Sequence, residues 1–205
     1  MTSSDTYDAE YFRRFTPRET GVLAELEKEA VEKDVPIVGP VVGKMLWLTA
    51  KIMKAERILE LGTATGYSAI WMARALSETG GKLTTIEWDA ETIERAKGNI
   101  AEAGYADTVE VLQGNAAEML SSFEPDTFDM IFQDIDMEMY LELLDNCARV
   151  LKPGGLMFFD NTAFKTAGNF LENSLKHPDL DGVHLYAFLP EHAPDWDGLT
   201  MLVKK

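Results

Sequence analysis

The 205-residue sequence lacks the features of a secreted, membrane-embedded or nucleic-acid-binding protein. Its single cysteine, Cys147, cannot close a disulfide within the chain. The first residues, MTSSDTYDAEYFRR, contain no apolar signal core, and no later apolar run has the length of a membrane span. Lys and Arg number 19 against 35 Asp and Glu, and the formal charge of −16 would repel a phosphate backbone. We therefore expect a cytoplasmic protein that binds neither membranes nor nucleic acid.

Internal repeats, low-complexity segments and Pro/Gly/Ser-rich linkers are also lacking. With 46% hydrophobic residues, the chain is long enough for one sizeable core and short for two. A single domain over residues 1–205 is the expectation.

Short apolar runs alternate with helical patterns along most of the chain. Helical patterns cover residues 22–30 and 41–53, before the first strand. The runs RILEL, KLTTIE, TVEVLQ, FDMIFQD and GLMFFD are then each followed by a helical pattern, at 68–77, 91–103, 116–123, 138–150 and 166–175. This order predicts an α/β fold with a parallel, doubly wound sheet covered on both faces. The last runs, VHLYAFL and GLTMLVK, are separated only by a loop, so we expect them to pair antiparallel at one edge.

The segment LELGTATGYS, residues 59–68, reads as a strand, a glycine turn and the start of a helix. Gly62 and Gly66 allow a tight turn and a close approach to a ligand, and Ser68 can cap the helix. The spacing lacks the three glycines of the dinucleotide fingerprint, which disfavours a pyrophosphate cradle and a nicotinamide dehydrogenase. Glu87 ends the next strand, where doubly wound folds place the acid that binds ribose hydroxyls. A ribose site without a pyrophosphate site indicates S-adenosylmethionine (SAM); the alternative is an ordinary turn and a solvated glutamate.

Polar side chains also end two later strands. Asp134 follows FDMIFQ, and Asp160 and Asn161 follow GLMFF, so these side chains should project from the same edge of the sheet. Two carboxylates and an amide oxygen suit a hard cation such as Mg²⁺ or Ca²⁺. In the alternative interpretation, Asp134 caps the next helix and Asp160 and Asn161 form a turn.

Five motifs, LELGTATGYS, TIEWD, QGNA, FDMIFQDID and FFDN, resemble in order and interval those of the cation-dependent O-methyltransferases. That family includes catechol and caffeoyl-coenzyme A O-methyltransferases, and the resemblance runs from about Val38 to the C-terminus. It implies a Rossmann-like class I methyltransferase fold with a mostly parallel seven-stranded sheet. It further implies a homodimer that uses SAM and Mg²⁺, Ca²⁺ or Mn²⁺ to methylate a hydroxyl of a small catechol-like acceptor.

The resemblance also assigns residues to the cofactor. Gly62, Thr63 and Ser68 match positions at its methionine end, with Glu60 beneath them, and Glu87 matches the ribose ligand. Trp88 and Ala116 match positions at the adenine. The whole implied cofactor set is Val38, Glu60, Gly62, Thr63, Ser68, Glu87, Trp88, Asn115, Ala116, Asp134 and Asp136.

Asp134, Asp160 and Asn161 match the metal ligands of the family, which makes Asp134 the candidate catalytic residue. The general base of the family is a lysine three residues after the metal aspartate, and Met137 stands at that position here. A thioether cannot accept a proton. The metal alone can activate the hydroxyl, Lys165 or His192 can serve as the base, or the protein binds the cofactor with reduced catalysis.

Two further alternatives concern the acceptor. The same fold in some bacterial relatives methylates a hydroxylated wobble uridine of tRNA, which the acidic composition disfavours. Phe164 and Trp196 are candidates for stacking on an aromatic acceptor, or each packs on its own loop.

Overall fold

The computed structural model describes residues 6–205 and contains one seven-stranded sheet with the order β3-β2-β1-β4-β5-β7-β6. The strands are β1 (Arg57–Leu61), β2 (Lys82–Glu87), β3 (Val109–Gln113), β4 (Phe128–Gln133), β5 (Leu151–Phe159), β6 (Leu180–Phe188) and β7 (Trp196–Lys204). The strands β1 to β5 are parallel to their neighbours in that group. The expected antiparallel pairing at one edge is confirmed, since β7 runs against both β5 and β6, with β6 outermost.

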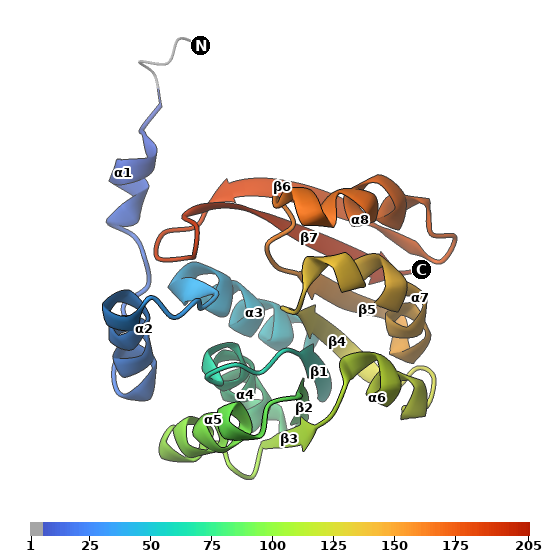
Figure 1. Cartoon of the computed structure of the whole chain (residues 1–205), viewed down its shortest axis with the longest axis horizontal. Helices are drawn as coiled ribbons and strands as arrows, with labels where there is room; N and C mark the ends of the chain where they lie inside the picture. The colour runs from blue at the N-terminus through green and yellow to red at the C-terminus, as the bar shows by residue number, and fades with distance from the viewer. Residues whose placement is uncertain (1–5) are drawn as a thin grey trace.

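Helices cover both faces of the sheet (Figure 1). One face carries α3 (Gly39–Met53), α4 (Tyr67–Thr79) and α5 (Ala90–Glu102), with α2 (Val22–Lys33) packed on α4. The other face carries α6 (Ala116–Ser122), α7 (Tyr140–Val150) and α8 (Gly168–Asn173). The short 3₁₀ turns η2 (Met137–Met139), η3 (Lys165–Ala167) and η4 (Ser174–Lys176) flank α7 and α8. Right-handed crossovers explain this covering of both faces.

The alternation of side chains along each strand supplies a core on both sides of the sheet. In β1, Ile58 contributes to the cluster under α3 and α4, whereas Leu59 contributes to the cluster under α7. Trp71 of α4 is fully buried in the first cluster. In the second cluster the rings of Phe159 and Phe170 lie 4.4 Å apart. Burial of these large apolar side chains is the main stabilising contribution to the fold.

The strand register brings three chain segments to the same level at the carboxyl edge of the sheet. Gln133 at the end of β4 pairs with Leu61 of β1 and with Phe159 of β5. The backbone N–H of Asp134 donates to Leu61 at 3.0 Å, and that of Asp160 donates to Gln133 at 3.0 Å. The residues that follow these strands therefore leave the sheet side by side.

The N-terminal helix α1 (Ala9–Arg13) stands away from the body of the molecule (Figure 1) and buries none of its own residues. Arg13 holds it in place through an ion pair with Asp195 at 2.6 Å, on the loop before β7. No helix within residues 6–205 is both long and apolar enough to cross a membrane.

Candidate active site

A cavity of about 680 Å³, the strand-end cavity, opens at the carboxyl edge of the sheet. Seven predicted cofactor residues line it: Gly62, Glu87, Trp88, Asn115, Ala116, Asp134 and Asp136. Three more, Val38, Thr63 and Ser68, line a small adjoining cavity that shares Pro36, Gly62, Ala64 and Asp134 with it. Glu60 is fully buried beneath Ser68. The structure therefore brings the whole predicted cofactor set together.

Glycine is required at position 62 for two reasons. Its φ of +94° lies in the left-handed region that favours glycine, and a Cβ there would overlap the carbonyl oxygen of Asp134. Gly66, with φ +84°, is the N-cap of α4 and provides no side-chain cap. The expectation that Ser68 caps this helix is therefore wrong, because Ser68 lies inside α4 and its hydroxyl donates to Glu60 Oε1 at 2.5 Å.

Burial changes the acidity of Glu60. Removal from water raises the pKa of its carboxyl to about 7, although the hydrogen bond from Ser68 partly opposes this. Its second oxygen, Oε2, has no hydrogen-bond partner within the described part of the chain. Nearby, the hydroxyls of Thr63 and Thr85 bond to each other at 2.6 Å. The floor below the glycine turn thus contains an acid that burial makes much weaker than an exposed glutamate.

Glu87 joins the loops that follow β1 and β2. Its Oε2 accepts from the Ala64 N–H at 3.2 Å, and its Oε1 accepts from the N–H groups of Trp88 at 2.9 Å and Asp89 at 3.2 Å. The Trp88 side chain is 77% exposed at the mouth of the cavity. Asn115 caps α6 by accepting from the Ala117 N–H at 2.9 Å. Each of these residues thus has a local structural role as well as a place in the cavity wall.

The two strand-end aspartates follow neighbouring strands, and Asp160 is buried whereas Asp134 is partly buried. Burial, together with the negative charges of Asp160 and Glu60, raises the pKa of Asp134 to about 8. Burial likewise raises the pKa of Asp160, against the opposing effect of His192. The Asp134 carboxylate accepts no hydrogen bond from any residue in the described range 6–205. It does not cap the next helix, and the N-cap of η2 is Asp136.

His192 belongs to the loop of residues 189–195, here named the histidine loop, which joins β6 and β7. Its Nε2 lies 2.9 Å from Asp160 Oδ2, and its Nδ1 lies 2.9 Å from the carbonyl oxygen of Pro194. The carbonyl oxygen of Pro194 can only accept, so Nδ1 donates to it, and Nε2 donates to Asp160 when that carboxyl is ionised. Burial alone would lower the pKa of His192, but the bond and charge of Asp160 raise it to about 9. The contact with Asp160 therefore favours the charged form of His192, which cannot accept a proton.

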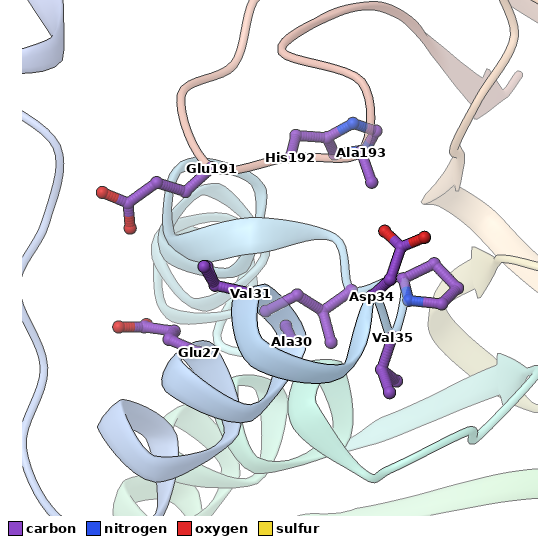
Figure 2. Close-up of a pocket in the computed structure, with 10 residues that line it drawn as sticks. Glu27, Ala30, Val31, Asp34, Val35, Glu191, His192 and Ala193 are labelled. Carbon is purple, nitrogen blue, oxygen red and sulfur yellow. The ribbon is translucent and has the colours of Figure 1, made fainter.

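A second cavity, the α2 cavity, lies beside His192 and has a volume of about 440 Å³. Figure 2 shows α2 and the segment after it on one side and the histidine loop on the other. Its lining consists of Glu27, Ala30, Val31, Asp34, Val35, Pro36, Ile37, Glu191, His192 and Ala193. Pro36 also lines the strand-end cavity, so the two cavities meet at this residue.

A family model described as O-methyltransferase matches residues 14–180. The chain belongs to the O-methyltransferase family. It is 36% identical to a catechol O-methyltransferase of Niastella koreensis over 170 residues, which cover 82% of this chain and 73% of that protein. It is also 36% identical to a catechol O-methyltransferase of Mycobacterium tuberculosis over 172 residues, covering 78% and 76%. The predicted family is therefore confirmed.

Solved structures of O-methyltransferases have the same fold. The enzyme TomG of Streptomyces achromogenes, in complex with SAM, has a TM-score of 0.83 and 28% identity over 100% of both chains. An O-methyltransferase of Bacillus cereus, in complex with SAH, has a TM-score of 0.83 and 28% identity over 96% of both chains. The predicted class I methyltransferase fold is confirmed.

Within this O-methyltransferase, the candidate bases differ in placement. Thr166 Oγ1 lies 3.5 Å from Met137 Sδ, so η3 packs against η2. Lys165, the residue before Thr166, is exposed and makes no ion pair with residues 6–205. In the sequence, the only link between Lys165 and the site is the short separation along the chain from Asp160. In the structure, the contact between η2 and η3 also places the Lys165 segment next to the turn that contains Met137.

The two candidate stacking residues do not reach the strand-end cavity of the O-methyltransferase. Trp196 lies 5.4 Å from the Phe188 ring and lines a separate cavity of about 400 Å³ next to α1. Phe164 is 42% exposed on the loop after β5. Trp196 therefore packs against other aromatic rings.

The donors at the strand ends fit a hard cation. Within residues 6–205 no cluster of three or more His, Cys, Asp or Glu side chains is arranged as a metal site, and the predicted set has two carboxylates and one amide. The charges of Asp160, Glu60 and Asp197 all raise the pKa of Asp134, and His192 is the opposing positive charge. This excess of buried acid suits an added divalent ion with oxygen ligands.

Proposed function

We propose that this O-methyltransferase transfers a methyl group from SAM to a hydroxyl of a small, catechol-like acceptor, with a divalent cation at Asp134, Asp160 and Asn161. The observation that carries the proposal is the register of β1, β4 and β5, which puts the glycine turn next to the buried Asp160 and the partly buried Asp134. Relatives named catechol O-methyltransferase and solved relatives in complex with SAM or SAH support it.

The strand-end cavity is our proposed SAM site. Glu87 keeps lone pairs beyond those used by backbone N–H groups, and these can accept from ribose hydroxyls. Trp88, Asn115 and Ala116 would border the adenine, since they line the same end of the cavity wall after β2 and β3. SAM supplies an activated methyl group on a positively charged sulfur, and the acidic residues Glu60 and Asp134 favour that charge.

The proposed cation ligands are Asp134, Asp160 and Asn161. The Asp134 carboxylate accepts no hydrogen bond from the described residues 6–205, so it needs no rearrangement to bind an ion. Asp160 retains lone pairs while it accepts from His192. A bound divalent ion lowers the pKa of a hydroxyl on it and fixes the orientation of the acceptor.

We propose the α2 cavity as the entrance for the acceptor. It meets the strand-end cavity at Pro36, and His192 in its wall contacts Asp160 (Figure 2). The apolar side chains of Ala30, Val31 and Val35 give it a surface for a small, partly apolar molecule. The acidic charge of the whole chain does not favour an RNA acceptor.

Lys165 is our candidate for the proton acceptor. Both ring nitrogens of His192 already have hydrogen-bond partners, whereas Lys165 is exposed and makes no ion pair within residues 6–205. The contact of Thr166 with Met137 holds the lysine segment against the turn after Asp134. A lysine can remove a proton when its amine is neutral, and neighbouring charge sets how often that occurs.

A homodimer is the proposed assembly. The aromatic side chains of Tyr7, Phe12 and Phe15 are 67%, 54% and 63% exposed, although they line an apolar cavity with Trp196. An isolated helix as short as α1 is not stable in water, so a covering surface is needed. A twofold dimer is the commonest solution. Light scattering after size-exclusion chromatography tests this, and a monomeric mass at micromolar concentration would refute it.

The direct test of the function is transfer from methyl-labelled SAM to a panel of catechols, first with Mg²⁺ and then with excess EDTA. We expect transfer that requires the cation, is lost in Asp134→Asn and is retained in Glu138→Gln. Glu138 is an exposed acid in the next turn and lines no cavity described above, which makes it a matched control. Transfer that EDTA does not change would refute the cation role. No transfer despite intact SAM binding would point to another acceptor or to reduced catalysis.

A further inference from the structure

Asp197, the second residue of β7, is a fully buried acid that the sequence did not single out. Its Oδ2 accepts from Asn161 Nδ2 at 2.7 Å. Its Oδ1 accepts from the backbone N–H groups of Gly198 at 2.5 Å and Ala163 at 3.3 Å. A Cβ on residue 198 would overlap the Ala163 nitrogen, so glycine allows β7 to approach this segment closely. Asp197 is thus held rigidly against the residue that follows Asp160.

The bond from Asn161 to Asp197 decides how the Asn161 amide is turned. A carboxylate can only accept, so the amide must direct its nitrogen toward Asp197. Its oxygen, Oδ1, then points away and accepts no hydrogen bond from the described residues 6–205. The backbone at Asn161 has φ +53°, a left-handed conformation that asparagine tolerates better than most residues. Backbone and side chain are therefore both fixed at this position.

We propose that Asp197 is a positioning residue that fixes the Asn161 amide so that it offers its oxygen, rather than its nitrogen, to a divalent cation. The proposal rests on the cation site proposed above. Divalent ions such as Mg²⁺ and Mn²⁺ take oxygen ligands, and an amide nitrogen that carries two hydrogens cannot bind them. Residues behind the ligands commonly hold them in the orientation that a metal needs.

Asp197→Asn tests the orientation with almost no change in shape. The introduced amide can keep its oxygen on the N–H groups of Gly198 and Ala163, but its nitrogen would then face Asn161 Nδ2. Two facing donors are unfavourable, so the Asn161 amide should rotate and turn its nitrogen toward the cation. Adding Asn161→Asp restores one donor facing one acceptor, with the polarity of the pair reversed, and supplies a carboxylate oxygen to the ion.

The readout is Mn²⁺ affinity, measured without acceptor by electron paramagnetic resonance of free Mn²⁺ at pH 8. We expect Asp197→Asn to weaken binding by about 10-fold to 100-fold, the usual effect of changing a residue behind a metal ligand. The double variant should regain most of the affinity. Glu60→Gln is the charge control, because it removes a buried acid near Asp134 without touching the amide of Asn161, and it should weaken binding much less. Thermal unfolding verifies that each variant is folded, and SAM affinity does so as well for the variants at positions 161 and 197.

The outcomes separate this inference from the proposed function. If the wild type binds Mn²⁺ and Asp197→Asn binds it equally well, the positioning role is refuted. Equal losses in Asp197→Asn and Glu60→Gln, or no recovery in a folded double variant, would also refute it, since charge or packing would then explain the loss. If the wild type binds SAM but no Mn²⁺, the cation site itself is refuted, and the role of Asp197 with it.

Discussion

Glu60→Gln should change how the stability of the metal-free protein depends on pH. Burial raises the pKa of Glu60 to about 7 from its usual value of 4.5. The folded protein therefore holds this proton more tightly than the unfolded chain does. As pH rises from 4.5 to 7, Glu60 ionises first in the unfolded chain, so the wild type loses stability over this window. Above the folded pKa the loss is complete and stays constant.

The size of the effect follows from the shift. The difference between 7 and 4.5 is 2.5 pKa units. At 1.36 kcal/mol for each unit this corresponds to about 3 kcal/mol for a fully buried group. The variant has no charge to lose at position 60, and its side-chain oxygen can still accept from Ser68. Glu60 also raises the pKa of Asp134, so its removal favours ionised Asp134 and acts in the same direction.

Urea unfolding in EDTA at several pH values between 4.5 and 8 measures this difference. The free energy of unfolding of the wild type minus that of Glu60→Gln should fall by about 3 kcal/mol as pH rises, and then level off. The other buried acids are present in both proteins, so most of their own pH dependence cancels. The exposed control Glu138→Gln should give a flat difference. A flat difference for Glu60→Gln as well would refute the inference that this acid is destabilised by burial.

Three further substitutions test the local geometry of the site. Gly62→Ala should lower the free energy of unfolding in urea by about 1 to 3 kcal/mol or more, because the backbone there is left-handed and a Cβ would overlap Asp134. The control Gly98→Ala, in open space on α5, should be neutral or stabilising. Asn115→Ala removes the cap of α6 and should cost about 1 kcal/mol by the same assay; no loss would mean that the cap is dispensable. Met137→Lys should accelerate methyl transfer to weakly acidic catechols relative to Met137→Leu, and equal rates would show that proton removal does not limit the reaction.

The order and type of the main elements could be predicted from the sequence because two periodicities alternate along it. Runs such as RILEL and FDMIF are mostly apolar, as expected for strands buried on both faces, and all seven expected strands occur. Helix ends were less accurate. Residues 137–139 form a 3₁₀ turn, because the Met139 N–H bonds to Asp136, so α7 begins at Tyr140 rather than at residue 138. The helix α1 was missed, since five residues that bury nothing leave no apolar period.

Part of the site was also predictable, for a geometric reason. Parallel strands present their carboxyl ends at the same edge, so polar residues that end such strands gather whatever their separation in the chain. Gly62, Asp134 and Asp160 come together in this way. Asn161 also begins a turn, as in part of the alternative interpretation, since the Phe164 N–H donates to the Asn161 carbonyl at 3.2 Å. A turn and a ligand pair are therefore compatible at one position.

His192 and Asp197 show where sequence reasoning ends. Their contacts with Asp160 and Asn161 depend on the path of the histidine loop, and no local pattern encodes that path. The structure also changes the interpretation of His192. The sequence makes it a candidate base, yet the contact with Asp160 raises its pKa to about 9 and favours the charged form, which cannot accept a proton. One such charge does not balance Asp134, Asp160 and Asp197 when all three are ionised. A histidine cation and the proposed divalent cation are therefore not alternatives here, because Asp134, whose pKa is raised to about 8, can hold either a proton or the added ion.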